Sequence, residues 1–369
     1  MANIPEEIQT WQMVVPWGKD KETGELIEGK IEKTTIPVPE LKEDEVLVEV
    51  AGCGVCHTDL GYFYDGVPTV NKPPLTLGHE ISGTVVAGDA KWIGKEVIIA
   101  AAMPCRKCYL CKTGRGNRCL AQKMPGNSMG IYGGFSSHIP VPSIDLCEVK
   151  DKGDMPLPHF SVIADAAATP FQAAKRADLQ PGDNAVVVGV TGGVGQYQGQ
   201  IVKALGAKTV IGIGRNAEKL ERSLSYGADF VINSTDKDAR AVTKEFRSFC
   251  KENGLPNYGW KIFEVTGTKP GQEIALSLLG FTGKLLVVGF GLQKVEYSIG
   301  RLMAFDAEII GTWGCLPEYY PVILDMALSK RIDVEAFVET RPLSSIVETF
   351  DEVHKTGSPM RRIVLTPDF

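Results

Sequence analysis

Residues 183–313 constrain the fold of this chain most, because apolar strand-like runs follow one another there with amphipathic stretches between most of them. The runs are AVVVGV, TVIGIG, DFVI, KIFEV, KLLVVGF and AEIIGTW. Helical periodicity is expected at residues 194–205, 217–225, 238–252 and 271–279. Six strands joined mainly by helical crossovers predict an α/β fold with a doubly wound parallel sheet.

A glycine-rich turn lies between the first strand and first helix of this region. The segment VVVGVTGGVGQ contains Gly189, Gly192, Gly193, Val194 and Gly195. Small residues there let backbone N–H groups approach a pyrophosphate at a helix N-terminus. The spelling G-x-x-G-G-x-G is one residue longer than G-x-G-x-x-G, and a plain glycine-rich turn is the alternative. The β-α-β context favours a dinucleotide site.

The end of the second strand bears on the choice of dinucleotide. NAD sites usually have an acidic residue there, which binds the adenosine ribose hydroxyls. This chain has Gly214 followed by Arg215. These residues favour the 2′-phosphate of NADP, although Asn216 offers a group for a ribose hydroxyl.

Residues 45–144 form a different, β-rich region of short strands separated by Gly and Pro, and it contains a cysteine cluster. Cys105, Cys108, Cys111 and Cys119 lie within one loop. Four thiolates complete a tetrahedral zinc site with no open position, so the spacing predicts a structural zinc. Four unrelated buried thiols are the alternative, but core cysteines are not usually spaced at three-residue intervals among Lys and Arg.

The sequence GCGVCHTD contains C-x-x-C-H, which has three chemical interpretations: a haem attachment site, a redox dithiol, or one metal ligand beside a cysteine that is not a ligand. Haem attachment normally requires export, and no export signal is visible at the N-terminus. Cys56, His79, Glu80 and Asp165 together form a second, dispersed set of metal-binding side chains. A thiolate, an imidazole and a carboxylate leave one zinc position open, as catalysis requires.

Composition narrows the classes of partner. The formal net charge is −6, which gives no general attraction to nucleic acid or anionic membranes. No apolar run approaches the roughly 20 residues that span a bilayer. We therefore expect a cytoplasmic protein with a small-molecule substrate, and nine cysteines that are not paired in disulfides.

GCGVCHTD, GHE, CxxCxxCx₇C and GVTGGVG, in this order, resemble zinc-containing medium-chain alcohol dehydrogenases along essentially the whole chain. The resemblance implies a GroES-like catalytic domain with a structural zinc lobe at 1–165, an NAD(P)-binding Rossmann domain at 166–330, and a returning segment at 331–369. It also implies two zinc ions per chain and a homo-oligomer, either a tetramer or a dimer. Within the family, the nearest resemblance is to enzymes that oxidise an alicyclic enoyl-CoA alcohol in anaerobic benzoyl-CoA breakdown.

The resemblance also assigns roles to individual residues. It makes Cys56, His79 and Asp165 the catalytic zinc ligands, with Glu80 as an exchangeable or supporting carboxylate and Cys53 as a non-ligand. Thr58 would accept the alcohol proton, whereas the position of the distal histidine found in many relatives is occupied by Gly61. The implied cofactor contacts are His57, Thr169, Gly189, Gly192, Gly193, Val194, Gly195, Gly214, Arg215 and Arg362.

Three rival functions remain at this point. One is a medium-chain dehydrogenase for another secondary alcohol or a polyol that uses NADP. Another is a zinc-binding nucleic-acid protein, and the third is a zinc-free reductase of similar shape. The enzymes that the chain resembles use NAD, while Gly214 and Arg215 favour NADP; we predict NAD, with NADP as the alternative.

Overall fold

The structure is a computed structural model and describes residues 5–20, 22–357 and 359–369. The chain divides into two compact units. Unit 1 comprises Met1–Asp165, Gly314–Leu328 and Val334–Phe369, and unit 2 comprises Ala166–Trp313 and Ser329–Asp333. Residues 314–328 therefore lie in unit 1 rather than in the predicted dinucleotide-binding region, because Tyr320 forms hydrogen bonds with Ala101 and Ala164.

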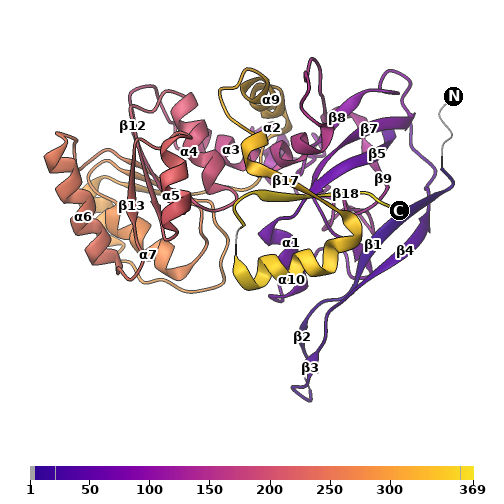
Figure 1. The fold of residues 1–369 in the computed structure, drawn as a ribbon, viewed down its shortest axis with the longest axis horizontal. Coiled ribbons are helices and arrows are strands. Elements are labelled where there is room, and N and C mark those ends of the chain that lie inside the picture. Colours follow the sequence, from indigo (N-terminus) through magenta and orange to yellow (C-terminus); the bar gives the residue numbers. More distant parts are fainter. Residues whose placement is uncertain (1–4, 21, 358) are drawn as a thin grey trace. The chain divides into compact units, whose positions relative to one another are not determined.

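Unit 2 contains the predicted parallel sheet, with six strands in the order β13-β12-β11-β14-β15-β16. Every pair of neighbouring strands is parallel. This confirms the doubly wound fold (Figure 1). The strands are β11 (Asn184–Val188), β12 (Thr209–Gly214), β13 (Phe230–Asn233), β14 (Lys261–Glu264), β15 (Lys284–Val287) and β16 (Glu308–Gly311).

Helices cover the sheet of unit 2 because their apolar residues recur at helical spacing. In α6, Val242, Phe246 and Cys250 pack into one core with Val186 and Val188 of β11. The helix α4 contacts β11 and β12 but contributes no residue to that core, so it covers the opposite face. The helices of unit 2 are α3 (Ala168–Arg176), α4 (Gly195–Ala204), α5 (Ala217–Leu224), α6 (Ala239–Glu252), α7 (Lys269–Leu278) and α8 (Gly300–Phe305).

Unit 1 is built on a sheet of seven strands, in which β10-β8-β7-β5-β18-β17 are neighbours and β9 also pairs with β5. A separate three-stranded sheet has the order β4-β1-β6, and β2 and β3 form a hairpin. The strands are β1 (Glu7–Val15), β2 (Gly18–Lys19), β3 (Leu26–Ile27), β4 (Lys30–Pro37), β5 (Glu45–Gly54), β6 (Leu75–Thr76), β7 (Glu80–Gly88), β8 (Glu96–Ile99), β9 (His138–Pro142), β10 (Leu146–Glu148), β17 (Val338–Pro342) and β18 (Arg362–Thr366).

Short helices connect the strands of unit 1 and carry several of the predicted site residues. The α-helices are α1 (His57–Phe63), α2 (Tyr109–Lys112), α9 (Tyr320–Leu328) and α10 (Ile346–Thr356). The 3₁₀ helices are η1 (Gly116–Arg118), η2 (Ser143–Asp145), η3 (Leu157–Ala164), η4 (Pro317–Tyr319), η5 (Glu335–Phe337) and η6 (Leu343–Ser345). In the described part of the chain, no helix has the length and apolar character needed to span a membrane.

The end of the chain returns to the central strand of unit 1. Val364 of β18 pairs with Gly54 of β5, and Gly54 in turn pairs with Glu80 of β7. These registers place β5, β7 and β18, which come from three distant parts of the sequence, side by side in one sheet. The last strand is therefore part of the metal-binding region.

Candidate active site and metal centres

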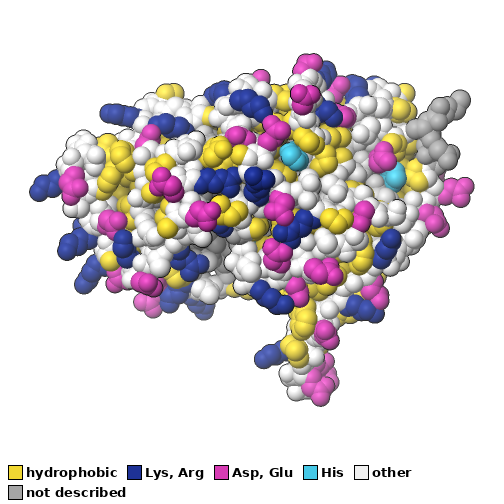
Figure 2. All heavy atoms as spheres, in the orientation of Figure 1, with side chains coloured by type: hydrophobic (Ala, Val, Ile, Leu, Met, Phe, Trp, Pro, Cys, Tyr) yellow, Lys and Arg dark blue, Asp and Glu magenta, His cyan; other side chains and the backbone are white. Residues whose placement is uncertain are grey.

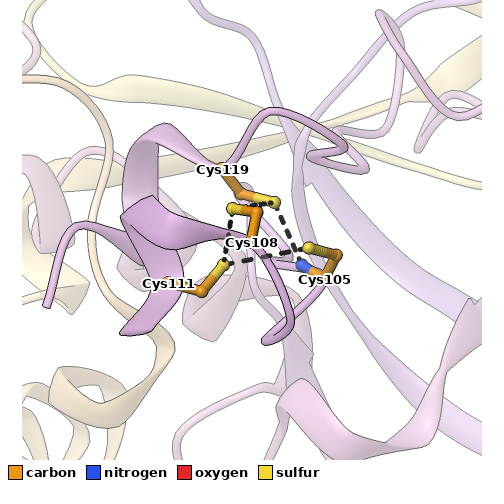
Figure 3. Close-up of side chains that lie close together, drawn as sticks. All are labelled: Cys105, Cys108, Cys111 and Cys119. Atoms are coloured by element: carbon orange, nitrogen blue, oxygen red, sulfur yellow. Dashed lines mark hydrogen bonds between the residues drawn. The ribbon is translucent and has the colours of Figure 1, made fainter. Parts of the chain in front are cut away.

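The four clustered cysteines lie close together in the loop between β8 and β9. Cys108 Sγ is 3.5 Å from Cys111 Sγ and 3.9 Å from Cys119 Sγ, and Cys105 Sγ is 4.0 Å from Cys111 Sγ (Figure 3). A tetrahedral zinc with bonds of about 2.3 Å to sulfur requires sulfur–sulfur separations of ~3.8 Å. The donor set and its spacing thus fit a structural zinc ion.

Backbone N–H groups contact two of the thiols in this segment, residues 105–119, which we call the cysteine lobe. Hydrogen bonds from the N–H groups of Cys111 and Leu120 lower the pKa of Cys108 to about 6. The N–H groups of Cys105 and Ala121 approach Cys119 Sγ at 3.2 and 3.3 Å. Thiolate is the metal-binding form, so the contacts of Cys108 favour metal over proton at neutral pH. Burial, by contrast, raises the pKa of Cys111 and of Cys119.

Arg106, between the first two cysteines, ties the lobe to the rest of unit 1. Its backbone is left-handed, with φ 58°, and its side chain forms an ion pair with Asp145. The Asp145 side chain is only 1% exposed, and Glu318 lies 3.7 Å from the same guanidinium. The conformation of the lobe therefore also brings a cation to a buried carboxylate.

The second group of metal-binding side chains is assembled from three separate segments. Cys56 precedes α1, His79 precedes β7, and Asp165 follows η3. Asp165 Oδ2 lies 3.7 Å from Cys56 Sγ and 3.5 Å from His79 Nε2. With Glu80 included, the donor atoms all lie within 4.8 Å of one another. One thiolate, one imidazole and one carboxylate fit a zinc site with an open position.

Asp59 fixes the orientation of two of these side chains. Its carboxylate accepts hydrogen bonds from the N–H groups of Cys56 at 3.1 Å and Gly78 at 3.0 Å, and lies 3.3 Å from His79 Nδ1. Burial opposes a charge on His79, but the negative charge of Asp59 raises the pKa of His79 well above its ordinary value. A proton on Nδ1 leaves Nε2, the atom nearer Asp165, as the metal donor.

Glu80 is held by Arg362 through a buried ion pair. Arg362 Nε donates to Glu80 Oε2 at 2.8 Å, and its Nη2 donates to Oε1. A Cβ atom at Gly54 would lie 2.1 Å from Glu80 Oε2, so only glycine leaves room for this carboxylate. This geometry favours Glu80 as a supporting carboxylate, while its predicted exchange onto the metal and the predicted pyrophosphate contact of Arg362 stay predictions.

Cys53 is separate from the metal-binding group. Its Sγ is directed to the carbonyl of Gly54 at 3.8 Å, and burial raises its pKa well above the ordinary thiol value. A buried neutral thiol is a poor metal donor and a poor redox nucleophile. The arrangement agrees with the interpretation of C-x-x-C-H in which Cys56 alone binds metal.

The predicted dinucleotide loop lies in unit 2. Gly189 has φ 97°, and a Cβ at Gly195 would lie 1.9 Å from the Gly189 carbonyl oxygen. Gly192 and Gly193 lie in the turn between them, and Val194 precedes α4 directly. The turn therefore depends on the absence of side chains, as a loop that approaches a pyrophosphate requires.

The end of β12 has no carboxylate. Gly214 is buried and is followed by the exposed Arg215. Asn216 Oδ1 accepts a hydrogen bond from the N–H of Lys219 at 2.9 Å, so it caps α5. The oxygen that caps α5 is therefore already engaged, so the cap competes with the contact to a ribose hydroxyl that was considered for Asn216.

The other predicted site residues lie in both units. In unit 1, His57 is exposed at the start of α1, and Thr58 Oγ1 lies 3.6 Å from Cys56 Sγ. In unit 2, Thr169 is half-buried in α3. Their cofactor and proton-transfer roles stay predictions.

Sequence reasoning missed the ion pairs of Arg362 with Glu80 and of Arg106 with Asp145 and Glu318, as well as the hydrogen bonds of Tyr320. Glu80 and Arg362 are 282 residues apart in the sequence. A single sequence has no spacing signal that pairs such residues. Only the strand registers of the folded sheet bring them together.

Comparisons with known proteins show the family to which the chain belongs. Residues 42–151 match the alcohol dehydrogenase GroES-like domain, and residues 193–329 match the zinc-binding dehydrogenase family. The chain is 30% identical to sorbitol dehydrogenase of Bacillus subtilis over 84% of this chain and 86% of that protein. It is 28% identical to sorbitol dehydrogenase of Bombyx mori over 91% of this chain and 94% of that protein. The fold is similar to galactitol-1-phosphate dehydrogenase from Escherichia coli, with TM-score 0.83, 23% identity, and coverage of 97% of this chain and 100% of that one.

The chain therefore belongs to the zinc-type medium-chain alcohol dehydrogenase family. It is a zinc-dependent oxidoreductase that acts on alcohols with NAD(P). The predicted fold class and enzyme class are confirmed.

Proposed function

We propose that this enzyme oxidises the secondary alcohol of 6-hydroxycyclohex-1-ene-1-carbonyl-CoA with NAD, giving the 6-oxo enoyl-CoA in anaerobic breakdown of aromatic compounds. The observation that supports alcohol dehydrogenase activity is that the donor atoms of Cys56, His79 and Asp165 lie within 4.8 Å of one another. The choice of substrate rests on the resemblance of the chain as a whole to enzymes with that activity, and no single motif or spacing identifies the substrate. The enzyme is proposed to act as a homo-oligomer.

The chain supplies the groups that hold the reactants and move the alcohol proton. Cys56, His79 and Asp165 would hold zinc, which as a Lewis acid lowers the pKa of an alcohol. Thr58, beside Cys56, accepts the alcohol proton through a hydrogen bond and cannot keep it. NAD(P) supplies the hydride acceptor.

The proton needs an exit from Thr58, because Gly61 cannot act as a base. Among the described residues, no hydrogen bond joins Thr58 to Tyr62, Tyr64 or Asp65. Asn127 Nδ2 donates to Tyr62 Oη, and Tyr64 Oη donates to Asp351 at 2.5 Å. Burial raises the pKa of both phenols, so neither acts as a base at neutral pH. We therefore propose that the proton leaves Thr58 through water.

A second substrate class is favoured by the names of the relatives. Two relatives are sorbitol dehydrogenases, and one is a D-arabinose 1-dehydrogenase that uses NADP. A polyol dehydrogenase that uses NADP is thus the alternative to the enoyl-CoA alcohol. It would have the same metal site, so the substrate and the cofactor are what separate the two proposals.

A substrate panel with and without CoA tests the choice. We expect kcat/KM for the hydroxy-enoyl-CoA thioester to exceed that for the corresponding free hydroxy acid by about 100-fold, because binding of the remote CoA portion contributes to transition-state stabilisation. Steady-state rates with the thioester, the free acid, sorbitol and xylitol provide the measurement. A higher kcat/KM for a polyol than for the thioester would overturn the enoyl-CoA proposal and leave the alcohol dehydrogenase class intact.

Arg215 is proposed to let the enzyme accept NADP in addition to NAD. Replacing Arg215 by alanine should lower kcat/KM for NADP by about 10- to 100-fold, because a hydrogen bond to a charged phosphate contributes ~1.5–3 kcal/mol. The value for NAD should stay within about threefold. Arg240→Ala, at another exposed arginine of unit 2, is the matched control. An unchanged ratio of NADP to NAD in Arg215→Ala would remove Arg215 from cofactor selection.

Two rivals from other classes make different predictions. Basic and acidic side chains are interspersed on the face shown in Figure 2, which offers no continuous basic surface for nucleic acid. A zinc-free reductase would contain no catalytic metal. The two groups of metal-binding side chains instead predict two zinc ions per chain, which elemental analysis can count.

A further inference from the structure

Tyr320 is a fully buried tyrosine whose hydroxyl joins two distant backbone segments of unit 1. It is the first residue of α9 and is 1% exposed. Its hydroxyl accepts a hydrogen bond from the N–H of Ala101 at 3.1 Å and donates one to the carbonyl of Ala164 at 2.5 Å. Burial raises its pKa well above the ordinary value, so the phenol stays protonated and keeps its donor.

The carbonyl that Tyr320 binds lies directly before a proposed metal ligand. Ala164 is the last residue of η3, where backbone carbonyls have no partner within the helix. Ala164 is 1% exposed, so bulk water does not reach it. The next residue, Asp165, leaves the helix with φ −140° and ψ −54°. Tyr320 therefore fixes the peptide from which the Asp165 side chain extends.

We propose that Tyr320 is a positioning residue for the catalytic metal site, which holds Asp165 in place through the Ala164 carbonyl. This inference rests on the proposed role of Asp165 as a ligand. Asp165 Oδ2 is already 3.5 Å from His79 Nε2 and 3.7 Å from Cys56 Sγ. A small rotation of the 164–165 peptide would move that oxygen away from both other donors.

The segment that carries Tyr320 is itself held by the cysteine lobe. Glu318, two residues earlier, lies 3.7 Å from the guanidinium of Arg106, between Cys105 and Cys108. Leu316 packs beside the lobe, with its Cδ2 3.5 Å from the position of a Cβ on Gly116. Residues 316–320 thus contact the structural lobe at one end and the backbone of the catalytic site at the other.

Tyr320→Phe removes only the hydroxyl and keeps the ring that fills the core. We expect the affinity of the catalytic site for zinc to fall about tenfold, as is typical when a group that orients a metal ligand is lost. The affinity is measured by competition with a chelator. The visible spectrum of the enzyme with cobalt at the Cys56 site should also change, which loss of stability alone would not cause. The metal at the four cysteines should keep its affinity.

Tyr197→Phe is the matched control, because Tyr197 is a fully buried tyrosine in α4 of unit 2. It should leave both the zinc affinity and the cobalt spectrum unchanged. If both variants alter the cobalt spectrum equally, the effect reflects general loosening and the positioning role of Tyr320 is overturned. An unchanged zinc affinity and spectrum in Tyr320→Phe would overturn it as well.

Asp165→Asn separates this inference from the function on which it rests. If Asp165 is a ligand, Asp165→Asn weakens the catalytic metal, and adding Tyr320→Phe should then cause little further loss. Fully additive losses would show that Tyr320 does not act through Asp165. If Asp165→Asn binds zinc as tightly as the unaltered enzyme, Asp165 is not a ligand, and the proposed ligand set is contradicted independently of Tyr320.

Discussion

Cys56→Ala is expected to lower kcat/KM for alcohol oxidation by about four orders of magnitude. The substitution removes the only thiolate of the proposed catalytic site, where Cys56 Sγ lies 3.7 Å from Asp165 Oδ2. Loss of a Lewis acid that stabilises the developing charge removes several kcal/mol of transition-state stabilisation. A barrier that is ~5.5 kcal/mol higher corresponds to a rate about 10⁴ times lower. Zinc content should fall by one ion per chain, which elemental analysis measures beside steady-state rates.

Cys53→Ala is the matched control, since Cys53 is the other cysteine of the C-x-x-C-H sequence and is 1% exposed. It should lose stability because a buried sulfur is removed, by about 1–2 kcal/mol. It should keep its full zinc content and a kcat near that of the unaltered enzyme. Equal loss of activity in both variants would instead point to a dithiol, and would contradict the assignment of Cys56 alone.

The parts that could be predicted from sequence depend on short-range patterns. The six strands of unit 2 and its helices α4, α5, α6 and α7 follow from apolar periodicity within each segment, and the four cysteines of the lobe lie within one loop. β4, by contrast, was not predicted, because its sequence KIEKTTIP is mostly exposed and lacks a regular apolar alternation. A strand that is stabilised mainly by pairing with its neighbour need not show an apolar pattern in its own sequence.

The catalytic site shows where sequence reasoning stops. Cys56 and Asp165 are 109 residues apart, and only the family resemblance selected Asp165 from the 45 acidic residues of the chain. The hydrogen bonds of Asp59 to Gly78 and of Tyr320 to Ala164 depend on the packing of segments that sequence spacing does not relate. Such supporting contacts require the fold itself.

Loss of the zinc lobe is expected to have the largest effect on stability. Cys111→Ala removes one of the four thiols, and structural zinc contributes about 10–16 kcal/mol of binding free energy in small zinc domains. The lobe should then lose its fixed conformation, so that Arg106 no longer neutralises Asp145, whose side chain is 1% exposed. Loss of ~4 kcal/mol would lower the melting temperature by roughly 10 °C for a unit of this size.

Thermal unfolding, elemental analysis and limited proteolysis of residues 105–119 together test this expectation. Cys147→Ala is the control, because Cys147 is a buried cysteine of β10 in the same unit and belongs to neither metal-binding group. It should keep two zinc ions per chain and a lobe that resists protease. Arg106→Met isolates the electrostatic part, since it leaves all four thiols in place while Asp145 loses its cation. If Cys111→Ala unfolds at the temperature of Cys147→Ala and keeps its zinc, the lobe is not the structural element that its geometry indicates.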